Sequence, residues 1–238
     1  LLACSRDRFL PIFATALRSL SLVLCSAEQM PLATEAAVEA VAACRDLVTE
    51  HRDTYLPHLA ESLGILAILQ GASVAPENSL AGVAEAVRYY RELVNVNREK
   101  YLGDLAGVLH TSARLHHSLG SQRTALEAVE ESVVLYREIV VRGKKVLLNG
   151  LADAMGTMAT LQRENCQQKE SLATVREVVD LYSELAQVDR SAFLPRLAEW
   201  LNNLAVLQGE GGCQEASLVS SARSVEAYRQ LVADNLEP

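Results

Sequence analysis

Apolar residues recur along this chain at a fixed interval of 46 positions, and within each interval they follow helical spacing. In the first interval the apolar or small positions after Phe9 are Phe13, Ala14, Leu17, Ser21 and Val23. Equivalent residues stand 46 positions further on in every later interval, as Leu63 does for Leu17. A period of 3.6 residues places such positions on one face of a helix. The pattern therefore predicts a leading helix at the start of each unit.

A second run of apolar positions follows in each unit and predicts a trailing helix. Its clearest marker is a Tyr at 90, 136, 182 and 228, whose place is taken by Cys44 in the first unit. Short polar or Gly/Pro-containing segments separate the two runs, so each unit is predicted to be a helical hairpin. We expect leading helices of ~15 residues and trailing helices of ~18. Pro11, Pro57 and Pro195 are expected in the first turn of the leading helix, where a missing N–H costs nothing.

The register of the repeat divides the whole chain. The predicted units are the end of a preceding repeat at 1–8, followed by repeats at 9–54, 55–100, 101–146, 147–192 and 193–238. Because the chain starts and stops at the same phase, we expect it to be a piece of a longer array within a multidomain protein. No polar capping repeat is visible at either end, which makes the ends candidates for self-association.

Stacking of the hairpins is the expected consequence of their two apolar faces. An isolated hairpin cannot cover both faces, so neighbouring units must pack on each other. Five stacked hairpins predict an all-α fold, an α-solenoid of antiparallel helical hairpins.

The positions of small residues resemble those of tetratricopeptide (TPR) repeats. In the last unit, Leu201-Asn202-Asn203-Leu204-Ala205 is similar to the start of that motif in its kinesin-light-chain-like form, with Ala205 in the small-residue position. The unit departs from the family in its length of 46 rather than the usual 34 residues. The Pro that ends the standard repeat is replaced by Arg45, Arg91, Arg137, Ser183 or Arg229. The resemblance implies a right-handed superhelix whose concave side is lined by the leading helices.

Composition and charge exclude several classes of function. The 22 Lys and Arg against 30 Asp and Glu give a net charge of −8, which disfavours nucleic acid as a partner because phosphate attraction needs a positive surface. No unbroken apolar run reaches the ~18 residues of a membrane span, so no membrane association is expected. The five cysteines form no C-x-x-C pair, which favours free thiols in a reducing, cytoplasmic compartment.

Catalytic and metal-binding patterns are missing from the sequence. His110 and His117 lie seven residues apart without a third ligand, and neither H-E-x-x-H nor G-x-S-x-G occurs. Glu39, Glu85, Glu131 and Glu177 recur at one phase of the repeat. Such regularity favours a solvated stripe or structural pairing, because a catalytic pair would break the repeat. We therefore expect no catalytic residues, no metal site, no cofactor and no enzymatic activity.

Positions that vary on the inner face of the leading helices are the candidate recognition residues. They are Arg18, Glu61, His110, Arg114, His117, Asp153, Thr160, Arg163, Glu199, Asn202 and Asn203. The TPR resemblance implies that asparagines such as Asn202 and Asn203 hold a peptide backbone. The sequence therefore predicts a protein- or peptide-binding scaffold with a mixed-charge groove. The alternative is an architectural spacer or oligomerisation segment that regulates an attached signalling domain.

Overall fold

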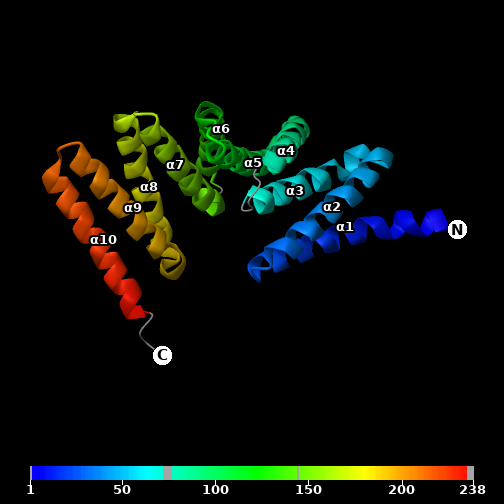
Figure 1. The fold of residues 1–238 in the computed structure, drawn as a ribbon, viewed down its shortest axis with the longest axis horizontal. Helices are drawn as coiled ribbons and strands as arrows, with labels where there is room; N and C mark the ends of the chain where they lie inside the picture. Colours follow the sequence, from blue (N-terminus) through cyan, green and yellow to red (C-terminus); the bar gives the residue numbers. More distant parts are fainter. Residues whose placement is uncertain (1, 72–76, 144, 235–238) are drawn as a thin grey trace. The chain divides into compact units, whose positions relative to one another are not determined.

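The computed structural model describes residues 2–71, 77–143 and 145–234, and these form helices in chain order (Figure 1). The helices are α1 (Leu2–Ser26), α2 (Met30–Glu50), α3 (Arg52–Gly71), α4 (Glu77–Val96), α5 (Arg98–Ser118), α6 (Gln122–Val141), the short 3-10 turn η1 (Lys145–Leu147), α7 (Leu148–Glu164), α8 (Gln168–Val188), α9 (Arg190–Glu210) and α10 (Gln214–Asp234). No strand occurs in these described ranges. The predicted all-α fold is confirmed.

Consecutive helices pack on one another. The chain divides into two compact units, Leu1–Leu135 and Tyr136–Pro238, with the division inside α6. In the first unit α1 packs on α2, α2 on α3, α3 on α4 and α4 on α5, and in the second α7, α8, α9 and α10 follow the same rule. Each odd-numbered helix is the leading helix of a predicted unit, and each even-numbered helix is the trailing one. The predicted boundaries of the individual repeats stay a prediction.

The leading helices α1, α3 and α9 begin earlier than the prolines indicate, which corrects the predicted placement of Pro11, Pro57 and Pro195. One residue, His51, separates α2 from α3, so Pro57 lies inside α3 rather than in its first turn. The starts of α5 and α9 are fixed by side-chain caps instead. Asn97 accepts a hydrogen bond from the Lys100 N–H at 3.1 Å, and Asp189 accepts one from the Ala192 N–H at 3.0 Å. Such caps satisfy N–H groups that have no partner within the helix. Several leading helices are therefore longer than expected, with 21 residues in α5 and α9.

The turns of four hairpins use a left-handed residue at the same repeat position. Glu28, Gly120, Cys166 and Gly212 have φ of 58°, 73°, 60° and 77°, and successive members of this series lie 46 or 92 residues apart. The following N–H closes the turn, as Ser121 N–H donates to the His116 carbonyl at 2.8 Å. This is the common way to end a helix, and glycine adopts it without steric cost.

Small side chains let the two helices of a hairpin approach closely. Ala106 and Ala198 of the leading helices are fully buried. Ser132 on α6 donates to the Ala106 carbonyl at 2.7 Å, and Ser224 on α10 donates to the Ala198 carbonyl at 2.8 Å. A buried hydroxyl needs such a partner. The small positions of the repeat therefore build the helix crossings.

A row of ion pairs connects trailing helices of successive hairpins. Arg45 pairs with Glu85 and Arg91 pairs with Glu131, each at 2.7 Å. Arg137 and Glu177 form the same contact at 2.6 Å. Each pair spans 40 residues, so the ladder obeys the repeat. Structural pairing is therefore the explanation of the recurring carboxylates from Glu85 to Glu177.

Helix α1 differs from one expectation. It runs without a break from Leu2 to Ser26. Its window Phe9–Ser26 has a mean hydropathy of 1.7 and is long and apolar enough, by length and composition, to cross a membrane. The expectation that no such segment exists was wrong, because it considered unbroken apolar runs alone, and this window includes Arg18 and several serines. Most of the window is exposed in this structure.

The described cysteines are free. Cys25, Cys44, Cys166 and Cys213 form no disulfide, in agreement with their scattered spacing, while the side chain of Cys4 lies outside the part described. Burial raises the pKa of the Cys44 thiol, although a hydrogen bond with Ser62 opposes the shift. A raised pKa keeps the thiol neutral and unreactive, so Cys44 acts as a small core residue.

Candidate functional site

In the first unit, two of the predicted recognition residues pair with each other. The Arg18 guanidinium on α1 lies 3.0 Å from the Glu61 carboxylate on α3 and 3.3 Å from Nδ1 of His58. Burial lowers the pKa of His58, and the charge of Arg18 lowers it further. These residues therefore connect neighbouring leading helices, which leaves less of their charge available to a ligand than the sequence suggests.

A shallow hollow of about 250 Å³ lies between α3 and α5, next to this ion pair. Its lining includes Glu61, Gly64, Asp104 and Gly107, with the ring of Tyr90 from α4 at its side. Partial burial and then the charge of Glu61 raise the pKa of Asp104. Two carboxylates sharing one hollow repel each other, so this surface favours a cationic or hydrogen-bond-donating group.

Arg114 borders a second hollow on the same two helices. The hollow measures about 130 Å³ and is also lined by Ile68, Gly71 and Thr111. Arg114 is exposed, while His110 and His117 are half-buried on the same helix. No cluster of three or more metal-ligating side chains occurs among the described residues.

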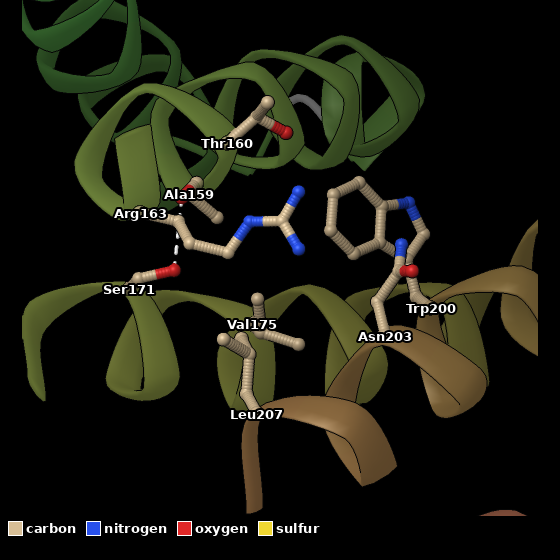
Figure 2. A pocket seen from close by; sticks show the side chains of 8 residues that line it. All are labelled: Ala159, Thr160, Arg163, Ser171, Val175, Trp200, Asn203 and Leu207. Carbon is tan, nitrogen blue, oxygen red and sulfur yellow. Dashed lines mark hydrogen bonds between the residues drawn. The ribbon is translucent and has the colours of Figure 1, made fainter. Parts of the chain in front are cut away.

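In the second unit, a hollow of about 50 Å³ lies among α7, α8 and α9 (Figure 2). Three predicted residues line it: Thr160 and Arg163 from α7 and Asn203 from α9. Figure 2 shows the Arg163 guanidinium pointing toward the ring of Trp200 and toward Asn203. Val175 and Leu207 form the apolar floor. The hollow thus places a cation, an amide and an aromatic ring side by side.

Trp200 is the residue of this hollow that sequence reasoning missed. Its register position holds Ala16, Ser62, Val108 and Ala154 in the other units, so a single large side chain among small ones was the available signal. A Cβ at Gly156 would overlap the Trp200 ring. The glycine on α7 therefore provides the space that the indole fills, and the two residues fix one edge of the hollow.

The remaining predicted residues of the second unit do not converge on the hollow. Asp153 accepts a hydrogen bond from the buried Tyr182 hydroxyl at 2.5 Å, and burial together with this bond raises the pKa of Tyr182. Glu199 lies 3.4 Å from Arg196 on its own helix. Asn202 is exposed beside Asn203 but does not line the hollow. Asp153 is thus engaged inside the protein, which its place on the leading helix did not reveal.

Comparison with known proteins shows which class of fold this chain adopts. The sequence matches no protein family profile and no curated protein. Solved structures match over nearly the whole chain. A kinesin-light-chain-like protein of Podosopora anserina with nearly identical TPR-like repeats has 19% identity and a TM-score of 0.64, with 98% of each chain covered. The fold is TPR-like.

Two further structures agree. A substituted variant of the same Podosopora anserina protein has a TM-score of 0.68 at 16% identity, covering 95% of this chain and 97% of its own. BtubC (BKLC) from P. vanneervenii has a TM-score of 0.60 at 12% identity, covering 98% of this chain and 93% of its own. The predicted resemblance to kinesin-light-chain-like TPR repeats is therefore confirmed at the level of fold.

Proposed function

We propose that this TPR-like array is a non-catalytic scaffold that binds a protein segment along its leading helices. TPR-like repeat proteins are generally protein-interaction scaffolds, and fold alone does not name a partner. The observation that carries the proposal is the hollow formed by Arg163, Trp200 and Asn203. Its three kinds of group match an acidic side chain, an apolar side chain and a peptide backbone.

The chemistry of the hollow selects an acidic extended peptide. Arg163 is exposed, and a guanidinium binds carboxylates through paired N–H donors. Trp200 is half-buried and offers one ring edge to the hollow, where an apolar side chain removes surface from water. Asn203 can both donate to and accept from a peptide backbone. The volume of about 50 Å³ suits one side chain and not a whole ligand, so the peptide lies across the face.

The chain carries its own reporter for this binding. It contains one Trp, and that residue lines the hollow. We expect a pool of capped heptapeptides with a Leu-Glu pair to change the Trp200 emission in a saturable manner, whereas a Leu-Lys pool does not. Arg163→Glu should weaken binding at least tenfold, because it replaces an attraction with a repulsion.

A matched control distinguishes a loss of binding caused by changing the hollow from one caused by changing the net charge of the protein. Arg176→Glu changes the same charge on the exposed side of α8, outside the hollow, and should leave the titration unchanged. Equal losses in the two variants would contradict the proposal, as would equal binding of both peptide pools. Arg114→Glu tests in the same way whether the hollow beside Arg114 in the first unit contributes to binding.

A further inference from the structure

Neighbouring leading helices of the first unit meet at equivalent places that are filled differently. Between α1 and α3, the Arg18 side chain leaves α1 and reaches the Glu61 carboxylate at 3.0 Å and Nδ1 of His58 at 3.3 Å. Only 16% of the Arg18 side chain is exposed. The space between these two helices is therefore occupied by a guanidinium together with its carboxylate and imidazole partners.

The repeat places a glycine at the position of this arginine in the next pair of leading helices. Gly64 on α3 corresponds to Arg18, and Asp104 on α5 corresponds to His58. A Cβ added at Gly64 would meet only Val108, at an ordinary distance of 3.6 Å, so close packing of the helices does not require the glycine. Where the arginine side chain lies in the first pair, the second pair has a hollow of about 250 Å³.

The second unit fills the same place in another way. Gly156 on α7 corresponds to Gly64, and Trp200 on α9 corresponds to Val108. The Trp200 ring occupies the space beside Gly156, since a Cβ there would overlap it. Val108 is too short to reach across in the same manner. Within the two described units, the α3–α5 pair is therefore the pair of leading helices that neither an arginine nor an indole fills.

The charges around the hollow between α3 and α5 suit a cation. The Asp104 carboxylate has no hydrogen bond or ion pair within the described part of the chain, and the ammonium of Lys100 lies 4.7 Å from the centre of the Tyr101 ring. Burial and the charge of Glu61 raise the pKa of Asp104, although Lys100 opposes the shift. Glu61 is 48% exposed despite its pairing with Arg18, and a carboxylate can accept more than one donor.

An arginine side chain matches the lining of this hollow as well as its charge. Ile65, Ile68 and Val108 line it alongside the carboxylates, and the apolar stem of an arginine packs on such residues while its charged head stays polar. A planar guanidinium binds carboxylates through paired N–H donors, which an ammonium cannot do. The volume of about 250 Å³ lies below the ~300–1,000 Å³ of pockets for small molecules, so the hollow suits a side chain.

We propose that the hollow between α3 and α5 binds an arginine side chain of a protein partner, whose guanidinium takes the place that Arg18 fills between α1 and α3 and contacts Asp104 and Glu61. The proposal extends the proposed scaffold role to a second hollow of opposite charge preference, and it does not depend on the Arg163 hollow. A divalent metal ion fits less well, because no group of three or more metal-ligating side chains occurs among the described residues.

Backbone-amide NMR of the 238-residue chain, with the capped peptide Ala-Ala-Arg-Ala-Ala as the probe, tests the site. We expect saturable shifts of the Gly64, Gly103 and Gly107 signals, because these glycines line the hollow. The same peptide with citrulline in place of arginine should bind at least fivefold more weakly, since citrulline keeps the shape and lacks the charge. Binding of the citrulline or lysine peptide as tightly as the arginine peptide would overturn the proposal.

A pair of charge variants assigns the binding to this hollow. Asp104→Asn should weaken binding of the arginine peptide at least fivefold, because it removes a charge-assisted partner. Asp180→Asn makes the same change at an exposed position on α8, outside the hollow, and should leave binding unchanged. Equal effects of the two variants would contradict the assignment.

The repeat also supplies a blocking variant. Gly64→Arg gives α3 the residue that α1 carries at this position, and its own guanidinium should fill the hollow and weaken peptide binding at least fivefold. Gly64→Ala adds only the Cβ that the site accommodates and should change binding less than twofold. Far-UV circular dichroism checks that both variants fold. Undiminished binding by Gly64→Arg, or an equal loss in both variants, would overturn the proposal.

Arg163→Glu separates this site from the proposed function. It should leave binding of the arginine peptide unchanged, and a loss would show that the peptide binds elsewhere and overturn the proposal. Failure of the Leu-Glu pool to change the Trp200 emission of the wild-type chain would instead reject the role of the Arg163 hollow alone.

Discussion

A left-handed backbone residue ends the first helix of the hairpins. Gly120 and Gly212 occupy this position in two units, but Cys166 and Glu28 occupy it in two others. A side chain with a Cβ is disfavoured at positive φ, because the Cβ crowds the following carbonyl oxygen. The repeat thus tolerates strain at Cys166 that a glycine would remove.

We expect Cys166→Gly to raise the free energy of unfolding by about 0.5–1 kcal/mol, since relief of the left-handed strain exceeds the added chain entropy. Gly120→Ala should lower it by about 1 kcal/mol for the opposite reason. Urea unfolding followed by circular dichroism measures both. Cys166→Ala removes the thiol but not the strain, and a gain in stability from that variant would contradict the explanation.

At the scale of elements, the Arg–Glu ladder connects trailing helices that are 40 residues apart in sequence. The carboxylate of Glu85 in this ladder accepts two side-chain hydrogen bonds, from Arg45 at 2.7 Å and from Tyr89 at 2.8 Å. Partial burial by itself would raise the pKa of Glu85, but the bonds from Tyr89 and Arg45 outweigh it, and the net shift is downward. The ionised form is therefore favoured in the folded state.

A lowered carboxyl pKa contributes stability above the ordinary value of 4.5 and loses it as the pH falls through the folded-state value. Glu85→Gln should therefore lower the free energy of unfolding by about 1 kcal/mol at pH 7. The difference from wild type should shrink as the pH falls below 4.5. Denaturant titrations at pH 7, 5 and 3.5 measure this, with the exposed Glu35→Gln as a control expected within about 0.5 kcal/mol. A difference that grows in acid would refute the assignment.

At the scale of the molecule, each unit is held together by contacts between successive helices and hairpins. In the first unit, α3 contacts α2, α4 and α5, and in the second, α9 contacts α8 and α10. The stability of such an array is approximately a sum of repeat and nearest-neighbour terms. Damage to one hairpin should therefore act locally.

Leu59→Ala removes a fully buried side chain from α3 and should cost about 2–5 kcal/mol. Native-state hydrogen exchange should accelerate in α2, α3 and α4, with little change in α8, α9 and α10. Leu201→Ala on α9 should give the reverse pattern. Equal acceleration throughout the chain would show one cooperative unit and contradict nearest-neighbour stability.

Much of the fold could be predicted from the sequence, because repeated apolar spacing is a local property. The period of 46 predicted the helical hairpins and their small buried positions, and the resemblance to TPR repeats predicted the TPR-like fold. The helix starts were placed too late, since the prolines were assigned to the first turn and the caps at Asn97 and Asp189 were not recognised. The candidate recognition residues do not all meet in the structure: Thr160, Arg163 and Asn203 line one hollow, while Asp153 bonds to Tyr182.

The sequence by itself determined which residues repeat, and therefore which faces of the helices can pack. Tertiary structure alone decided which varied residues meet: Arg18 with Glu61, and Trp200 over Gly156 beside Arg163. The physical reason is that the periodicity of buried positions is a property of each single helix and can be read from its sequence. A contact between side chains of neighbouring hairpins depends instead on distances across the packed interface, which no single helix encodes.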